Sequence, residues 1–224
     1  MFRSVTIFRL LICVLALFSQ GCKPQYSDFF PYHDDGTPKP NVVLMPVIAA
    51  CETQIPWNLS QEFSSDVRTS IMRNGKLFVP TQQELRQAAS SVSTRELTSA
   101  KDLMPFLYFQ PAHFVVVMEL IEHKQVPYQR GKTKPLYLAN VPEREAKVLM
   151  IKVRLKIVDI RGGDPKLIRQ EIVQSNHMIP EDGIQESVQK HGKEGFPNSP
   201  LGLAYGRCIR DIVEKIERVT SFQR

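Results

Sequence analysis

The sequence lacks the closely spaced residue pairs from which most catalytic and metal sites are built. Its five histidines stand far apart, with no HxxxH or HExxH spacing, and its four cysteines form no CxxC pair. A GxSxG nucleophile turn and a glycine-rich phosphate loop are missing too. These absences predict a protein without a cofactor or metal and argue against an enzyme. The alternative is a hydrolase whose site assembles from residues distant in the sequence.

Long apolar runs are also scarce, and the first is too short to cross a membrane. Leu10 to Phe18 is continuously apolar, whereas a spanning helix needs about 20 residues. Arg3 and Arg9 precede or open this run, and no acidic residue stands nearby. A basic start with a short apolar core is typical of a secretory signal peptide. We therefore predict a removed segment over residues 1–21, the alternative being a buried core helix.

The end of this segment resembles the lipobox of bacterial lipoproteins. Gly21 and Cys22 fit that motif, while Ser19 and Gln20 are looser than the usual Leu-Ala or Leu-Ser. The resemblance implies that the Cys22 thiol carries a diacylglycerol and that Cys22 begins the mature chain, with palmitate as a typical acyl group. Lys23 replaces the Asp that often retains such proteins at the inner membrane, so we expect an outer-membrane anchor facing the periplasm. Plain secretion is the alternative.

Charge of one sign is not concentrated anywhere in the exported chain. Of 29 basic residues, Arg3 and Arg9 leave with the signal, so 27 remain against 23 acidic ones. A nucleic-acid binder would show a concentrated basic stripe, so we expect no nucleic-acid partner. The sequence also gives no reason to infer a small-molecule substrate.

The exported chain divides into a tether and one domain. Residues 22–40 contain several prolines, Gly36 and the acidic pair Asp34-Asp35, without a sustained period. Proline removes a backbone donor and blocks helix, so this segment is predicted to be a lipidated, irregular tether. Residues 41–224 have the length of one ordinary domain and are predicted to form a periplasmic α/β domain.

Hydrophobic periodicity predicts the elements of the first half of that domain. We expect a buried strand over 41–47 that Pro46 interrupts, a helix over 59–74, a strand over 76–80, helices near 81–92 and 102–107, and a strand over 114–122. In the first helix, Asn58 and Gln61 form a capping-box pattern and Asn74-Gly75 marks the end.

The second half contains the clearest pattern of the chain. From Leu149 to Ile157 apolar residues alternate with basic ones, which is typical of a half-buried strand. A turn over 161–165 and a returning strand over 167–179 complete an antiparallel hairpin, and Ser199 caps a final helix that begins with Pro200. Residues 125–142 and 181–198 are polar and are predicted to be loops. The fold class is therefore a mixed sheet with a long hairpin and helices packed on it.

Three basic residues and two cysteines are the remaining candidates for function. Lys152, Arg154 and Lys156 share one face of the hairpin strand. They form a solvated sheet face or, alternatively, a docking face for an acidic partner or anionic lipid headgroups. Cys51 and Cys208 are the cysteines that remain beside Cys22 after export, and they form either one disulfide or two separate thiols.

This order of elements resembles a group of periplasmic domains. The group includes the curli-secretion lipoprotein, the lipoprotein activators of penicillin-binding proteins and the amino-terminal domain of TolB. The likeness covers NVVLMPV, NGKLFVPTQQEL, HFVVVMELIE and the turn DIRGGD, and the chain also resembles chlamydial lipoproteins. Polar, proline-containing loops disagree with the membrane hairpins of the curli channel, which need alternating apolar residues.

The resemblance and the residues together predict a role outside catalysis. We expect a membrane-anchored lipoprotein of the cell envelope that binds an envelope protein or assembles with copies of itself. The alternative is an envelope hydrolase with a site assembled from residues distant in the sequence.

Overall fold

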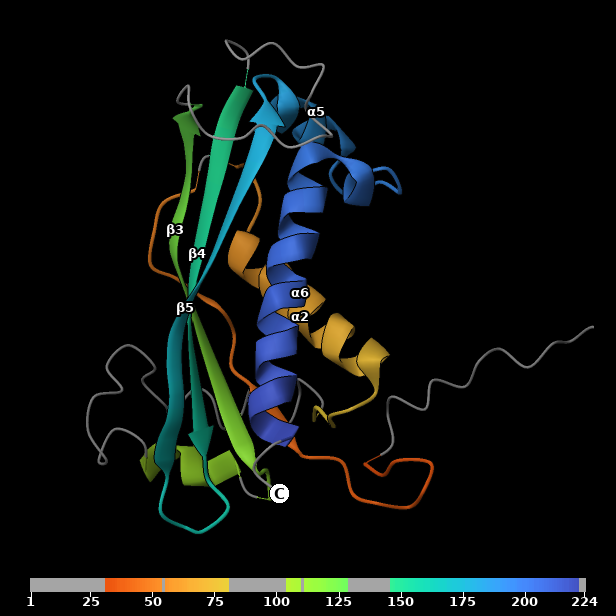
Figure 1. Cartoon of the computed structure of the whole chain (residues 1–224), viewed down its shortest axis with the longest axis vertical. Coiled ribbons are helices and arrows are strands. Elements are labelled where there is room, and N and C mark those ends of the chain that lie inside the picture. The colour runs from red at the N-terminus through yellow and green to blue at the C-terminus, as the bar shows by residue number, and fades with distance from the viewer. Residues whose placement is uncertain (1–30, 54, 81–103, 110, 129–145, 222–224) are drawn as a thin grey trace, which may run out of the picture.

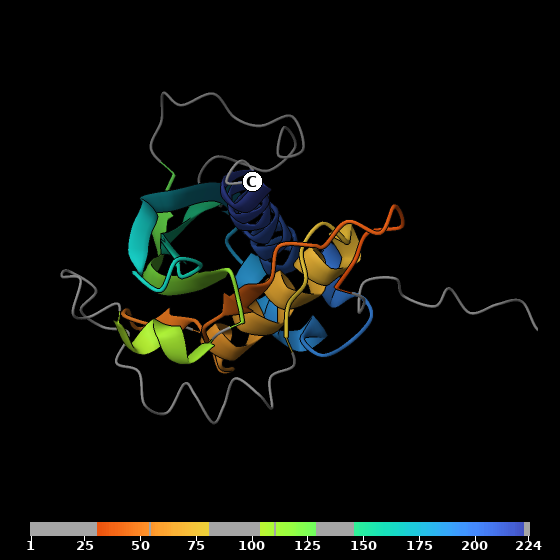
Figure 2. The ribbon, with the colours of Figure 1, turned by 90° about the horizontal axis from the view of Figure 1, so that it is seen from below.

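The computed structural model describes residues 31–53, 55–80, 104–109, 111–128 and 146–221, which form a single α/β domain. Helices α2 (Leu59–Asn74) and α6 (Pro200–Ser221) cross each other on one face of a mixed sheet (Figure 1). The short helix η2 (Met104–Phe109) packs on the opposite face, near one end (Figure 2). The predicted fold class is confirmed.

The sheet has five strands and combines parallel with antiparallel pairing. In chain order they are β1 (Val42–Leu44), β2 (Ile48–Ala49), β3 (Phe114–Pro127), β4 (Ala146–Asp159) and β5 (Lys166–Pro180). The spatial order is β1-β3-β4-β5, with β2 also pairing with β3. The β1 and β2 pairs are parallel, whereas β3, β4 and β5 form an antiparallel meander.

The first strand ends before Pro46, as predicted, and a second short strand follows the proline. Pro46 lies between β1 and β2 and lacks a backbone N–H. The next donor, the N–H of Val47, turns toward α2 and donates to Ser64 Oγ at 2.8 Å. Pairing with β3 resumes when the Ala50 N–H donates to the Leu120 carbonyl at 3.0 Å. The interruption thus ties the sheet to the first helix.

The hairpin of β4 and β5 forms the centre of the domain. The predicted turn is present, and Gly163 adopts φ +71°, a conformation that glycine takes without strain. The five apolar side chains of β4 that point toward the helices are all fully buried: Leu149, Ile151, Val153, Leu155 and Ile157. The predicted orientation of this strand is therefore confirmed.

Both long helices begin, and α2 ends, where the sequence predicts. Asn58 Oδ1 accepts from the Gln61 N–H at 3.1 Å, and Gly75 ends α2 with φ +67°. Ser199 Oγ accepts from the Gly202 N–H at 3.2 Å and caps α6. Near the other end of α6, the buried Glu217 accepts from Asn74 and Lys76, which locks the two helices together.

Three predicted boundaries are wrong. The strand over 76–80 is reduced to one bridge between Asn41 and Phe78. The predicted loop at 125 starts too early, because β3 continues to Pro127 opposite β4. The predicted loop over 181–198 contains the helix α5 (Gly183–Lys190) and the turn η5 (Phe196–Asn198). Packing against α6 accounts for α5, since helices this short are not stable by propensity alone.

Several predicted segments lie outside the described residues. These are the signal segment with Cys22, the first part of the tether, the helix near 81–92 and most of the predicted loop over 125–142. The last part of the tether, residues 31–40, folds back through a bridge between Tyr32 and Pro38. Among the described helices, none has the length and apolar character required to cross a bilayer.

The core makes a prediction about stability. Leu155 is fully buried, whereas Leu203 on α6 is exposed. We expect Leu155→Ala to lower the free energy of unfolding by about 2–5 kcal/mol, because it removes buried apolar surface and leaves a cavity. Leu203→Ala makes the same chemical change at the surface and should stay within about 0.5 kcal/mol. Urea denaturation measures both, and equal losses would contradict the described orientation of β4.

Candidate functional site

The strand β5 has a free edge. β5 pairs with β4 on one side, and within the described ranges no backbone hydrogen bond leaves its other side. An unpaired strand edge presents backbone donors and acceptors to any extended segment that approaches it. At 15 residues β5 is much longer than an average strand of about 5–6 residues, so this edge is a large one.

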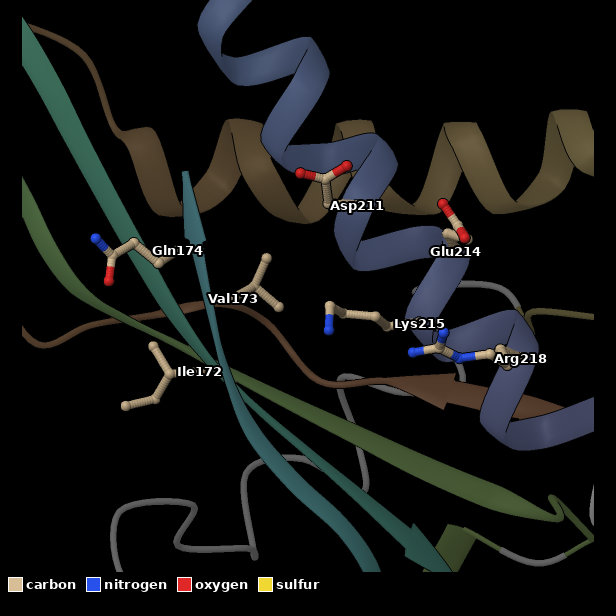
Figure 3. A pocket seen from close by; sticks show the side chains of 7 residues that line it. All are labelled: Ile172, Val173, Gln174, Asp211, Glu214, Lys215 and Arg218. Carbon is tan, nitrogen blue, oxygen red and sulfur yellow. The ribbon is translucent and has the colours of Figure 1, made fainter. Parts of the chain in front are cut away.

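A groove of about 390 Å³ lies between this edge and α6. Figure 3 shows the strand on one side and the helix on the other, with polar and charged side chains at the helix. The lining residues are Ile172, Val173, Gln174, Asp211, Glu214, Lys215 and Arg218. We call this groove together with the free edge of β5 the edge site.

Charge is distributed unevenly along the edge site. Lys215 Nζ forms an ion pair with Glu171 Oε1 of β5 at 3.0 Å. Burial works to raise the pKa of Glu171, but hydrogen bonds from Lys215 and Arg169 outweigh it and bring the pKa below its usual value. Glu214, directly before Lys215, and Asp211, one turn earlier on the same helix, are both exposed, and the exposed Arg218 follows. The groove is therefore acidic toward the start of α6 and basic toward its end.

The outward face of β5 beside the groove is uncharged. Gln170, Ile172, Gln174 and Asn176 lie on the sheet face opposite the helices, since their β4 partners lie there. Ile172 is 54% exposed, an unusual position for a large aliphatic side chain in a strand. Proteins commonly place lysine or another charge on an exposed edge to prevent association. That protection is absent from these four residues.

The three basic residues of β4 do not form an open positive face. Arg154 and Lys156 both contact Glu119 of β3, at 2.7 and 3.3 Å, and Lys152 pairs with Glu122. Lys156 is only 6% exposed and Glu119 only 5%. The expectation of a fully solvated face is therefore wrong at Lys156, because the preceding strand supplies a buried carboxylate. Docking of an acidic partner at these residues stays a prediction.

One serine–histidine pair bears on the hydrolase alternative. Ser175 and His177 are two residues apart on β5, and Ser175 Oγ lies 2.7 Å from His177 Nε2. His177 lines a pocket of about 240 Å³ with Glu186 and Arg207, but Ser175 does not line it. Burial lowers the pKa of His177, and the charge of Arg207 lowers it further while that of Asp211 opposes this. Ser175 therefore has no access to the pocket that His177 lines.

A second buried histidine has a structural partner. His123 Nε2 lies 3.0 Å from Tyr205 Oη, between β3 and α6. Burial lowers the pKa of His123 and raises that of Tyr205, so both groups are neutral near pH 7. The contact gives His123 Nε2 and the Tyr205 hydroxyl a hydrogen-bond partner inside the core.

A Ser-x-x-Lys spacing, which some acyl-transfer enzymes use, was missed in the sequence and is structural here. Ser187 Oγ is fully buried, donates to the Gly183 carbonyl and accepts from the Leu201 N–H. Lys190 pairs instead with Glu186. The serine therefore joins α5 to the start of α6.

Cys51 and Cys208 are both free thiols, so the considered disulfide is not formed. Burial raises the pKa of Cys208 to about 12 and also raises that of Cys51. Within the described part of the chain, no three metal-ligating side chains lie close enough together to hold an ion. Cys22 lies outside it, and its acylation stays a prediction.

The buried ion pair leads to a second stability prediction. Lys156→Met keeps the aliphatic length but removes the charge beside buried Glu119. We expect a loss of about 1–3 kcal/mol, since a buried charged group loses a hydrogen-bond partner while Arg154 still compensates part of it. The matched change Lys152→Met alters a more exposed pair and should cost less than about 1 kcal/mol. Urea denaturation measures the free energy of unfolding of both variants. A larger loss for Lys152→Met would contradict the assignment of Lys156 and Glu119 as the buried pair.

Comparison with known proteins gives one family and several similar structures. A hypothetical protein from Chlamydia trachomatis, CT253, shares 24% identity over 81% of this chain and 98% of its own, with a TM-score of 0.57. Lipoprotein GNA1162 from Neisseria meningitidis shares 10% identity over 80% and 98%, with a TM-score of 0.41. The C-terminal domain of LpoB from Salmonella enterica shares 17% over 62% and 85%, with a TM-score of 0.33.

The chlamydial structure supports the fold, and bacterial lipoproteins are among the similar structures. No curated protein matches the chain. A family model described as "Family of unknown function (DUF7499)" matches residues 28–223, which include almost the whole domain and all of its described elements. The chain therefore belongs to this family.

Proposed function

We propose that this protein is a lipid-anchored, non-catalytic component of the bacterial cell envelope that binds a protein partner through the edge site. The observation that carries the proposal is the long unpaired edge of β5 beside a groove of mixed charge. An added strand satisfies backbone donors and acceptors along such an edge, and neighbouring side-chain pockets supply specificity. The charged residues of α6 are placed to orient that strand.

The anchor is the part of the proposal that rests on sequence. The basic start, the short apolar core and Gly21-Cys22 are what an acylated protein requires. Each buried methylene group contributes about 0.8 kcal/mol, and two or more acyl chains give stable attachment. Lys23 after the cysteine favours the outer membrane facing the periplasm as the final location.

A binding role suits the described surface better than a hydrolytic one. A serine nucleophile must reach the substrate and a base together, and Ser175 is buried away from the pocket that His177 lines. The edge site offers backbone groups, an exposed aliphatic side chain and charges on a helix. These are the features of a surface that recognises an extended polypeptide.

The anchor is tested by replacing one cysteine. Cys22→Ser should abolish incorporation of labelled palmitate and leave the unprocessed chain, because the serine hydroxyl cannot form the thioether. Cys13→Ser lies in the same segment and should leave labelling unchanged. Labelling that survives Cys22→Ser would end the lipoprotein assignment.

The edge site is tested by photo-crosslinking in intact envelopes. A photoreactive amino acid at Gln174 in the full-length chain should give discrete protein adducts. The same photoreactive amino acid in place of Tyr108, which is exposed on η2 at the opposite face of the sheet, should give few adducts. Adding Ile172→Lys should reduce the Gln174 adducts several-fold, because it places a charge on the edge. Adducts of equal yield at both positions, or none at Gln174, would refute binding at this site.

A further inference from the structure

The edge of β5 is regular where it borders the groove. The register shift in the β4–β5 pair lies between Ile157 and Val158, opposite the start of β5. From Arg169 onward the pairing with β4 continues without another shift. This section can therefore accept a straight added strand, whereas a bulge would bend the edge away.

Two kinds of side chain alternate along this section. The outward row contains the uncharged Gln170, Ile172 and Gln174, and the row facing the helices contains Arg169 and Glu171 followed by Val173 and Ser175. The outward row is nearly symmetrical about Ile172, with a glutamine two residues away on each side. A twofold interface repeats each contact, with residue i facing j and residue j facing i, so in this row each glutamine can face a glutamine of a second copy.

We propose that the partner of the edge site is a second copy of this chain, whose β5 pairs antiparallel with the first about a twofold axis at Ile172. The inference rests on the proposed function and names its partner. In this register Ile172 lies opposite Ile172, Gln170 opposite Gln174, and Arg169 opposite Ser175. Each pair belongs to the same face of its strand, as direct opposition in an antiparallel sheet demands.

The register also matches the charges of the groove. Arg169 of each copy reaches the helix-facing side of the other copy beside Ser175. Asp211 lines the groove there together with Val173 and Gln174. Its charge works to raise the pKa of His177, which lies two residues beyond Ser175 on β5. Asp211 has no ion pair among the described residues, and Arg169 is half exposed despite its contact with Glu171. The two copies thus bring opposite charges together twice.

Registers shifted by two residues do not place Ile172 opposite its own copy. A twofold axis at Gln174 places Ile172 opposite Asn176 and moves Arg169 to Ile179, beyond Asp211. An axis at Gln170 places Ile172 opposite Ile168, at the irregular part of the strand. Among these three registers, only the one with its axis at Ile172 packs the exposed Ile172 side chain against Ile172 of the other copy.

Single-cysteine crosslinking in envelopes tests this arrangement with the full-length chain. Directly opposite residues have Cα atoms about 4.5–5.5 Å apart, within the range of a disulfide. In a Cys51→Ser background, Ile172→Cys should therefore form a covalent dimer on mild oxidation. Leu167→Cys, exposed on the same strand, should not, because ten residues separate it from its own copy, roughly 34 Å. Cys208 stays silent, since its thiol is buried and its pKa is about 12.

A charge exchange gives the second measurement. Arg169→Glu should lower the yield of the Ile172→Cys dimer several-fold, because it brings like charges together. Adding Asp211→Arg should restore most of that yield, which a general loss of folding would not allow. Equal dimer yields at positions 167 and 172, or the absence of rescue, would overturn the inference.

The outcome separates the two proposals. If Gln174 crosslinks to a protein of another mass and Ile172→Cys gives no dimer, the proposed function holds and the second copy is the wrong partner. If neither position gives a protein adduct, both are refuted.

Discussion

The whole structure depends on the burial of one face of one strand. β4 places five aliphatic side chains against the helices, and its two neighbours run antiparallel to it along almost its full length. Burial of side chains of this kind contributes about 1.5–3 kcal/mol each. This row is the surface on which α2 and α6 cross, so the position of the groove beside α6 follows from it.

The opposite face of the same strand shows how charge is accommodated in a sheet. Glu119 lies on β3 between Arg154 and Lys156 of β4, so two cations share one buried carboxylate. A buried pair gives little net stability relative to apolar residues, yet it penalises any slip in register strongly. A shift of one residue would place these charges in the core and turn the apolar row out of it. The pair and the apolar row therefore disfavour the same slip.

Sequence reasoning succeeded where local pattern and tertiary structure agree. The alternation of β4, the caps of α2 and α6 and the interruption at Pro46 are all local signals, and each appears in the structure. It failed at α5, which is held by Ser187 and by packing on α6 rather than by its own propensity. It failed at Lys156 because the partner Glu119 stands 37 residues earlier. The edge site could not be predicted, since the order of strands decides which one lies at the edge.

The chain enters and leaves the domain at the same end, and this constrains how the domain can meet a membrane. Residues 31–40, the β4–β5 turn and the end of α6 all lie at one end of the long axis (Figure 1). Nine residue steps separate Cys22 from Pro31, a reach of about 30 Å when fully extended. Two antiparallel copies place these ends at opposite extremes of the assembly. With Cys22 acylated as proposed, the lipids of both copies could enter one bilayer only when the strands run parallel to its surface, so a pair joined at β5 would lie flat on the membrane, whereas a single copy could stand upright.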